Sequence, residues 1–122
     1  NCHPMFGSVT EWFYRWLAGI RPVPEHPGFD TFILAPFVPK GLDSARAVYR
    51  SPHGEIISGW KRNDDAVKYD ISIPEGSLAD VRLHLQIGEI IESQASEIDG
   101  LLSGRFRLKP GKYIITQRRE TR

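Results

Sequence analysis

The sequence contains a single cysteine, Cys2, among its 122 residues, so no disulfide can form within the chain. It has no apolar run long enough to cross a bilayer, and its first residues lack the basic flank and apolar core of a secretory signal. We therefore expect no membrane association. One cysteine does not identify a redox compartment, so the sequence leaves the localisation unknown.

An excess of charge of one sign is also absent. Sixteen basic and fifteen acidic residues give a net charge of +1, and the basic side chains are scattered apart from those in the terminal QRRETR. Because binding to nucleic acid needs a concentrated basic surface, we expect no nucleic-acid partner. The length, with 40% hydrophobic and 25% charged residues, is typical of one globular domain plus an appendage.

The most apolar stretch covers residues 5–19, MFGSVTEWFYRWLAG, and predicts an amphipathic helix. Apolar residues recur there at spacings of three and four, the period of one buried helix face. This stripe consists of Phe6, Val9, Phe13, Trp16 and Ile20, and the further apolar residues Met5, Trp12 and Leu17 lie beside it. Pro4 suits the first helical position and Gly19 suits the residue just past the end.

A helix this apolar needs cover on more than one side. We expect Trp12, Phe13 and Trp16 to make its structural contacts. The chain starts at Asn1, without a methionine and directly before this helix, so we expect a piece of a longer protein. If the helix is left uncovered, it should fold back on the rest of the chain, pair with a second copy or aggregate.

The rest of the chain predicts a stiff connector followed by short strands. Residues 21–30 contain three prolines and a glycine, which oppose a helix or a central strand. From Thr31 onward, alternating apolar and polar residues are separated by turn residues. The expected strands lie within residues 31–37, 44–50, 55–62, 66–73, 79–85, 87–93 and 105–116.

These segments favour an antiparallel β-sandwich of seven or eight short strands. The SPHG turn at residues 51–54 predicts a hairpin between its flanking strands. A second hairpin is expected within residues 105–116, turning at Lys109 to Lys112, because Pro-Gly favours a type II turn. Residues 94–104 give no clear strand or helix signal.

Short motifs occur along residues 1–85 in a characteristic order. They include CH (2–3), FGSV (6–9), EW (11–12), AGIRP (18–22), PGF (27–29), ARAVY (45–49), SPHG (51–54), SGWKR (58–62) and IP (73–74). In order and spacing these motifs resemble bacterial α-L-rhamnosidases, from the end of the catalytic domain into the carboxy-terminal β-sandwich domain. Each motif is short, so the resemblance rests on their combination.

The resemblance implies an inverting glycosidase with an (α/α)6 barrel. Residues 1–20 would be the last barrel helix, residues 21–30 a connector and residues 31–122 the C-terminal sandwich, which would cap the barrel. Inversion uses two carboxylic groups about 6.5–9.5 Å apart. In the family both come from upstream barrel segments, so this chain alone is expected to be inactive, with no metal and no cofactor.

The resemblance also implies one residue that contacts substrate. His3 resembles the histidine that lines the rhamnose subsite just before the last barrel helix, so the implied partners are the upstream barrel and a rhamnose-containing glycan. Two neighbours depart from the family pattern, which commonly has Asn in place of Cys2 and an aromatic in place of Pro4. In this chain alone, the favoured interpretation of His3 is a frayed terminal residue, whereas in the intact protein it is the sugar contact.

Other candidate catalytic or metal-binding residues have simpler interpretations. Glu11 pairs with Arg15 at i,i+4, which lowers the pKa of a carboxyl and is wrong for a general acid. The acidic pair at residues 64–65 is typical of a turn. The pair of Cys2 with its neighbour His3 is unsuited to nucleophile–base geometry, and no third group orients it.

The remaining candidates lie on predicted strands and turns. His53 and His84 have no partners at the spacing of metal ligands. Trp60, Tyr69 and Tyr49 alternate along strands, which favours a place in the core, although on an exposed sheet they would form a platform for sugar rings. Two alternatives to a structural cap therefore stay open: a stand-alone carbohydrate-binding module, and an interaction domain that docks through its apolar helix.

Overall fold

The computed structural model describes residues 16–23, 25, 28–63, 65–94 and 98–120. Most of the helix predicted over residues 5–19 lies outside these ranges, and so do Trp12 and Phe13. Its last turn is described, and Trp16–Ala18 are helical there. No helix within the described part of the chain is long and apolar enough to cross a membrane.

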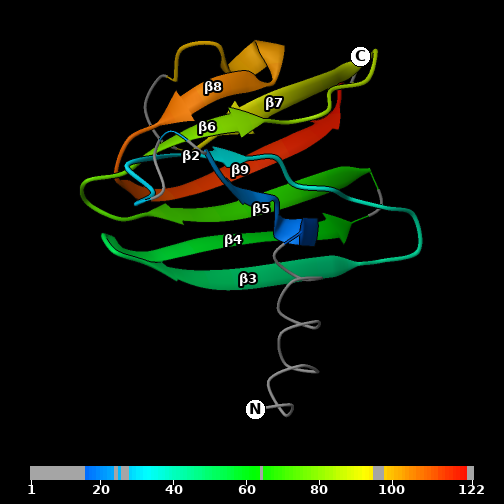
Figure 1. The fold of residues 1–122 in the computed structure, drawn as a ribbon. Coiled ribbons are helices and arrows are strands. Elements are labelled where there is room, and N and C mark those ends of the chain that lie inside the picture. The colour runs from blue at the N-terminus through cyan, green and yellow to red at the C-terminus, as the bar shows by residue number, and fades with distance from the viewer. Residues whose placement is uncertain (1–15, 24, 26–27, 64, 95–97, 121–122) are drawn as a thin grey trace, which may run out of the picture.

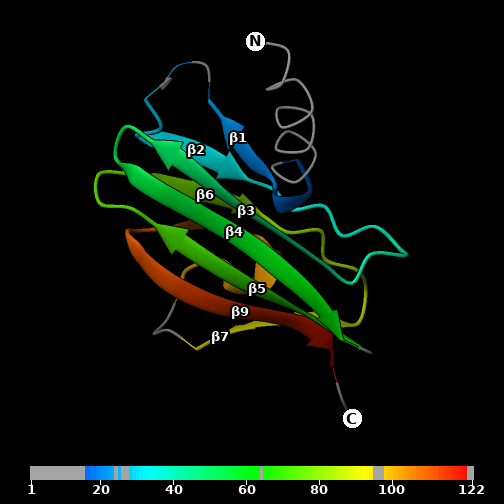
Figure 2. The same ribbon diagram turned by 90° about the horizontal axis from the view of Figure 1, so that it is seen from below.

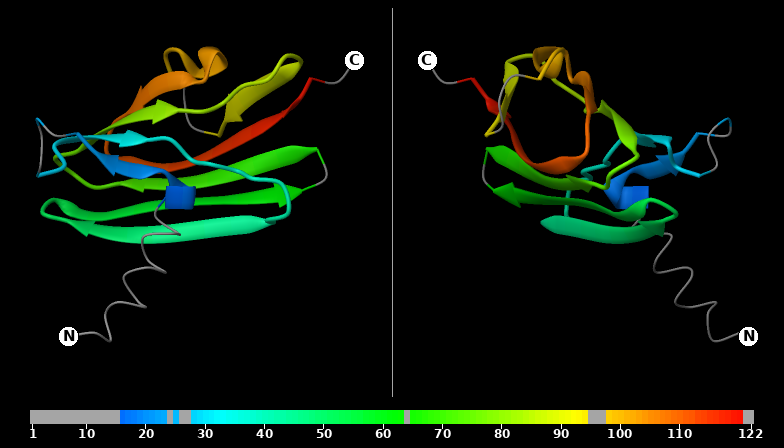
Figure 3. Two further views of the ribbon diagram at one scale, coloured as in Figure 1. Left: turned by 45° about the vertical axis from the view of Figure 1, so that its right-hand side comes forward. Right: turned by 90° about the vertical axis from the view of Figure 1, so that its left-hand side faces the viewer.

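Two β-sheets face each other and form a sandwich (Figures 1 and 3). One has four strands in the order β1-β2-β6-β8, and the other has five in the order β3-β4-β5-β9-β7. The first sheet contains β1 (Ile20–Pro22), β2 (Thr31–Leu34), β6 (Leu78–Arg82) and β8 (Arg105–Leu108). The second contains β3 (Ser44–Ser51), β4 (Gly54–Asn63), β5 (Ala66–Ile73), β7 (Glu89–Ser93) and β9 (Gly111–Arg119).

The predicted β-sandwich is confirmed, with nine strands among the described residues. All strand pairs are antiparallel except β2 with β6, which run parallel. Within the described residues, one 3-10 turn, η1 (Leu101–Ser103), lies in the stretch over residues 94–104 that shows no clear strand or helix pattern. The SPHG hairpin is also confirmed, because Ser51 pairs with Gly54 across a two-residue loop.

Buried and exposed side chains alternate along the strands, and the buried ones form the core between the sheets. In β5, Tyr69, Ile71 and Ile73 are buried, whereas Lys68 and Asp70 are exposed. This pattern confirms the predicted strand with one wet face. The four-stranded sheet contributes further buried side chains: Phe32, Leu34, Ala79, Val81, Phe106 and Leu108.

The hairpin predicted to turn at Lys109 to Lys112 is wrong. Strand β8 pairs with β6 in the four-stranded sheet, whereas β9 lies between β5 and β7 in the other sheet. The chain therefore crosses from one sheet to the other at Lys109 and Pro110 (Figure 1). A Pro-Gly pair turns the backbone in either case, so local turn chemistry could not distinguish a hairpin from a crossing.

The segment expected to be a connector starts as a strand. Ile20–Pro22 form β1, and Ile20 pairs with Leu34 of β2 (Figure 2). Because β1 lies at the edge of its sheet, Pro22 is tolerated there despite its missing N–H. The prolines thus exclude a central strand, as expected, but not an edge strand.

Replacing the buried side chain of Phe32 tests this core. Its side chain is fully buried in β2, and its ring centroid lies 5.8 Å from that of Phe29. Replacing Phe32 with Ala should lower the free energy of unfolding by about 3–5 kcal/mol, because it leaves a cavity between the sheets. Urea denaturation measures the change. The matched control is Leu102→Ala at a side chain that is 71% exposed, which should cost less than about 0.5 kcal/mol. Equal losses in the two variants would contradict this core.

Candidate functional site

The end of the last helical turn, at Leu17 and Ala18, is buried in the core of the sandwich. Leu17 and Ala18 are 1% and 0% exposed, and Leu17 belongs to the same core cluster as the strand residues. The last carbonyls of a helix have no partners within the helix itself. At a buried helix end they must therefore find donors from the surrounding protein.

Three donors from the sandwich supply these partners. Ser58 Oγ donates to the carbonyl of Ala18 at 2.7 Å, and Trp60 Nε1 donates to the carbonyl of Leu17 at 3.2 Å. The backbone N–H of Phe37 also donates to Leu17, at 2.9 Å. Ser58 and Trp60 are two residues apart on β4, so both face the interior. The N–H of Ala35 donates to the carbonyl of Gly19, the residue after the helix. We call Ala35, Phe37, Ser58 and Trp60 the helix socket.

Gly19 makes the turn between the helix and β1. Its φ is +80°, a left-handed conformation in which glycine is favoured. Its N–H donates to the carbonyl of Trp16 at 3.1 Å, and its own carbonyl accepts from Ala35 at 2.9 Å. A Cβ on Gly19 would lie 2.1 Å from the backbone carbon of Ala35, so no side chain fits. The predicted helix end at Gly19 is confirmed.

Small side chains on β3 accompany this arrangement. Ala45 pairs with Trp60, and Ala47 pairs with Ser58, in the register of β3 and β4. Ala45 is buried and Ala47 half-buried on the face that the socket donors share. Larger residues here would compete for space with the helix end, because protein interiors are close-packed.

Beside the socket lies an exposed aromatic pair. The rings of Trp16 and Phe37 have centroids 4.9 Å apart and are inclined at 45°. Trp16 is 38% exposed and Phe37 is 45% exposed. The socket therefore buries the backbone end of the helix but leaves much of the Trp16 indole in solvent.

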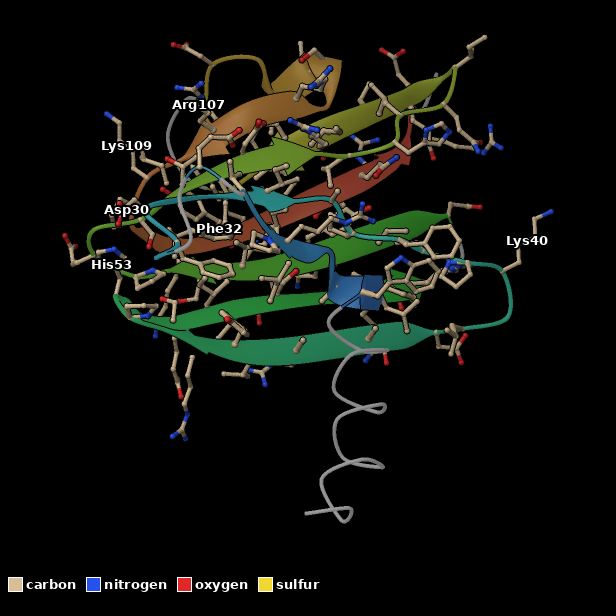
Figure 4. The ribbon with its side chains drawn as sticks, in the orientation of Figure 1. Asp30, Phe32, Lys40, His53, Arg107 and Lys109 are labelled. Atoms are coloured by element: carbon tan, nitrogen blue, oxygen red, sulfur yellow. The ribbon has the colours of Figure 1, made fainter. Side chains whose placement is uncertain are left out.

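A polar pocket of about 380 Å³ opens at the end of the sandwich beside the loop over residues 35–43. Lys40 in this loop lies at the opposite end of the molecule from Asp30 and His53 (Figure 4). The pocket is lined by Pro36, Phe37, Val38, Lys40, Arg62, Val67, Tyr69, His84, Gln86, Glu89 and Gln117. We refer to this set of residues as the polar pocket.

A chain of hydrogen bonds fixes the floor of the polar pocket. Tyr69 Oη donates to Gln117 Oε1 at 2.9 Å. Gln117 Nε2 then donates to the carbonyl of His84 at 2.7 Å and to Glu89 Oε1 at 2.8 Å. Burial, with a smaller effect of the Glu89 charge, raises the pKa of Tyr69 above its usual value. Tyr69 therefore stays a hydrogen-bond donor at physiological pH.

Arg62 lies on another side of the pocket. Its Nη2 donates to the carbonyls of Val38 and Pro39, which ties the loop over residues 35–43 to the end of β4. Its Nε is buried and has no hydrogen-bond partner among the described residues. An unsatisfied buried donor of this kind costs about 1–3 kcal/mol.

The family model of the bacterial alpha-L-rhamnosidase C-terminal domain matches residues 19–97. The chain belongs to this family. An alpha-L-rhamnosidase of Streptomyces avermitilis is 32% identical over 79 residues, which cover 65% of this chain and 8% of that protein. One from Formosa agariphila is 27% identical over 81 residues, covering 66% of this chain and 8% of the relative.

Solved rhamnosidase structures share the fold of this domain. The enzyme from Dictyoglumus thermophilum superposes with a TM-score of 0.74 at 26% identity, covering 94% of this chain and 14% of that one. The Streptomyces avermitilis enzyme complexed with L-rhamnose gives a TM-score of 0.69 at 25% identity, covering 91% and 11%. This rhamnosidase C-terminal domain thus spans a small part of the proteins that it matches.

The structure places several of the predicted site residues. Trp60 and Tyr69 are 2% and 3% exposed, so their expected place in the core is confirmed and they form no exposed platform. His53 Nε2 lies 2.5 Å from Asp30 Oδ1, and both side chains are partly exposed (Figure 4). The described residues contain no group of three or more side chains that could hold a metal ion.

Other predicted residues lie outside the described part of the rhamnosidase domain. These are Cys2, His3, Glu11, Trp12, Phe13, Arg15 and Asp64. The proposed sugar contact of His3 and the helix contacts of Trp12 and Phe13 therefore stay predictions. Trp16 is described, and its ring contacts Phe37.

Two polar residues of the site escaped the sequence prediction. Ser58 lies between Ile56 and Trp60 on the buried face of β4, and Gln117 follows Ile115 on the buried face of β9. A polar residue at an apolar position of an alternating strand is the signal that could have identified both. Buried polar groups need partners, so such positions indicate a specific hydrogen bond.

Gly19 offers a sharp test of the helix socket. Gly19→Ala should lower the free energy of unfolding by more than about 2 kcal/mol, because it adds a backbone clash to the strain of a positive φ. The matched control is Gly41→Ala, since Gly41 also has a positive φ (+92°) but open space around its Cβ position. That variant should cost about 1–2 kcal/mol from strain alone. Chemical denaturation measures both, and a Gly19 variant no worse than the control would contradict the socket geometry.

Proposed function

We propose that this chain is the C-terminal part of an inverting α-L-rhamnosidase that hydrolyses terminal α-L-rhamnose from glycosides or polysaccharides. In this proposal residues 1–20 form the last helix of the catalytic barrel, and residues 21–30 connect it to the sandwich. Residues 31–122 cap and stabilise the barrel. The observation that carries the proposal is the helix socket, which buries the end of one helix in the core of the family's C-terminal domain.

Through the helix socket, the sandwich fixes the position of the proposed last barrel helix. Donors on β4 and in the loop over residues 35–43 fix the helix end by three hydrogen bonds. A helix held at one end transmits its position along its length. A misplacement of about 1 Å at a catalytic site can cost ~100-fold in rate. His3, before the start of this helix, is the residue proposed to contact the rhamnose hydroxyls.

The chain's own carboxylates support a catalytic pair placed upstream. An inverting glycosidase needs one carboxyl group with a raised pKa to act as the acid. Glu92 instead bonds Arg118 at 2.9 Å, and this hydrogen bond lowers the pKa of the Glu92 carboxyl. Asp80 pairs with Arg82 at 3.1 Å. Neither of these two carboxyls is therefore suited to proton donation. We propose no catalytic residue and no metal or cofactor in this chain.

A second candidate function is a protein interaction through the exposed aromatic pair. Trp16 and Phe37 present a shared apolar surface beside the helix socket. In the proposed enzyme the upstream barrel covers this surface. In the chain alone, a second copy takes its place. A carbohydrate platform on an open sheet face is less favoured, because Trp60 and Tyr69 point into the core.

Hydrolysis of para-nitrophenyl α-L-rhamnopyranoside tests the main proposal. The 122-residue chain should release no nitrophenol, whereas a longer protein that includes the whole upstream barrel should turn over. Within the longer protein, His3→Ala should reduce kcat/KM, because it removes a sugar contact. Lys112→Ala, at an exposed position on β9, is the control and should leave turnover unchanged. Activity of the 122-residue chain by itself would place the catalytic carboxylates within it and overturn the proposal.

Light scattering at several protein concentrations tests the aromatic surface. The 122-residue chain should associate as its concentration rises, because the apolar side chains of Trp16 and Phe37 are partly exposed to solvent. Phe37→Ser should shift the equilibrium toward the monomer. Ile87→Ser is the matched control, since Ile87 is a fully exposed apolar side chain that does not belong to the pair, and its loss should change nothing. A wild-type chain that stays monomeric at every concentration would contradict this surface as an interface.

A further inference from the structure

The polar pocket is separate from the buried donors of the helix socket. It shares Phe37 with the socket, but Ser58 and Trp60 do not line it, and Arg62, which does, holds the carbonyls of Val38 and Pro39. Neither the cap proposed for the sandwich nor the aromatic interface uses its polar floor. A cavity of about 380 Å³ is at the small end of the range for ligand sites, suited to one ring rather than to a long chain.

Hydrogen bonds within the protein already hold the side chains of the pocket floor in place. Tyr69 fixes the amide of Gln117, and that amide and the N–H of Gln86 both donate to Glu89 Oε1. No described residue donates to Glu89 Oε2. The Glu89 carboxylate is thus held in one orientation, and its Oε2 is available to accept a hydrogen bond. A ligand hydroxyl that donates to this oxygen would bind without reorganising the floor.

Arg62 contributes the positive charge and the hydrogen-bond donors that complement the Glu89 carboxylate. Its guanidinium supplies hydrogen-bond donors only, and Arg62 lines the pocket. The pocket therefore places a positive group and a negative group around one space. A fully anionic ligand would meet Glu89, and a cationic ligand would meet Arg62. A neutral ligand with several hydroxyls can donate to the first and accept from the second.

Apolar side chains complete the pocket. Pro36, Phe37, Val38 and Val67 line it beside the polar groups. A sugar ring presents hydroxyls around its edge and C–H groups on its faces, and these faces pack well against aromatic and aliphatic side chains. From these features we propose that the polar pocket is a binding site for a single neutral sugar ring, with Glu89 and Arg62 as its hydrogen-bonding residues and Phe37 as its apolar wall.

The site follows from the chemistry of the pocket, whereas the choice of L-rhamnose as the first probe rests on the proposed function. The experiment is a titration of the isotope-labelled 122-residue chain with L-rhamnose, followed by nitrogen–proton NMR. The signals of the Gln117 side-chain amide and the Arg62 Nε–H should shift together. A dissociation constant of about 1 mM is expected for one small ring.

Glu89→Gln is the decisive variant. It keeps an oxygen for Gln86 and Gln117 but replaces the spare acceptor with a donor, so the fold should persist while sugar affinity falls at least tenfold. Lys68→Gln is the matched control, because Lys68 precedes Tyr69 on β5 but is exposed on the other face of the sheet. This variant should bind the sugar like the original chain. A Glu89→Gln chain that keeps its backbone spectrum and its full affinity would overturn the proposal.

Further probes separate the ligand class from the proposed function. D-Galactose, D-glucuronate and inorganic phosphate are titrated under the same conditions. Binding of galactose but not of rhamnose supports the sugar site and leaves the rhamnosidase proposal to its own activity test. Shifts at the pocket with glucuronate or phosphate alone would overturn the neutral-sugar assignment. Shifts with none of the four probes would overturn the site itself.

Discussion

The structure depends on how a helix can end inside a hydrophobic core. The carbonyls of Leu17 and Ala18 are buried and need donors, and Ser58, Trp60 and the backbone of Phe37 provide them. Because β1 follows directly after Gly19, this end also starts the four-stranded sheet. Hydrogen bonds from β4 hold the helix end against the five-stranded sheet, and the first strand of the four-stranded sheet begins directly after it. The helix end and the sandwich therefore form one packed unit.

The loop over residues 35–43 connects the two sites of the domain. On one side Ala35 and Phe37 bond the end of the helix, and on the other Arg62 ties the loop to β4 beside the polar pocket. The same loop therefore contributes both to the wall of the polar pocket and to the helix socket.

Much of the fold could be predicted from the sequence because its strands alternate clearly. The pattern of β5 and the turns around it indicated which face is buried, and Gly19 marked the helix end. The last crossing could not be predicted, because Lys109 and Pro110 turn the chain equally well within one sheet or between two. The socket and the pocket were missed for a related reason. Ser58 and Gln117 find their partners 40 and 33 residues away along the chain.

The alternation, the turns and the family resemblance follow from neighbouring residues and their order along the chain. Which strands are neighbours, including the parallel pair β2 and β6, depends on the three-dimensional packing. That packing also decides where buried polar groups find partners. The physical reason is that a hydrogen bond between distant residues depends on how two sheets pack, and no local spacing encodes that packing.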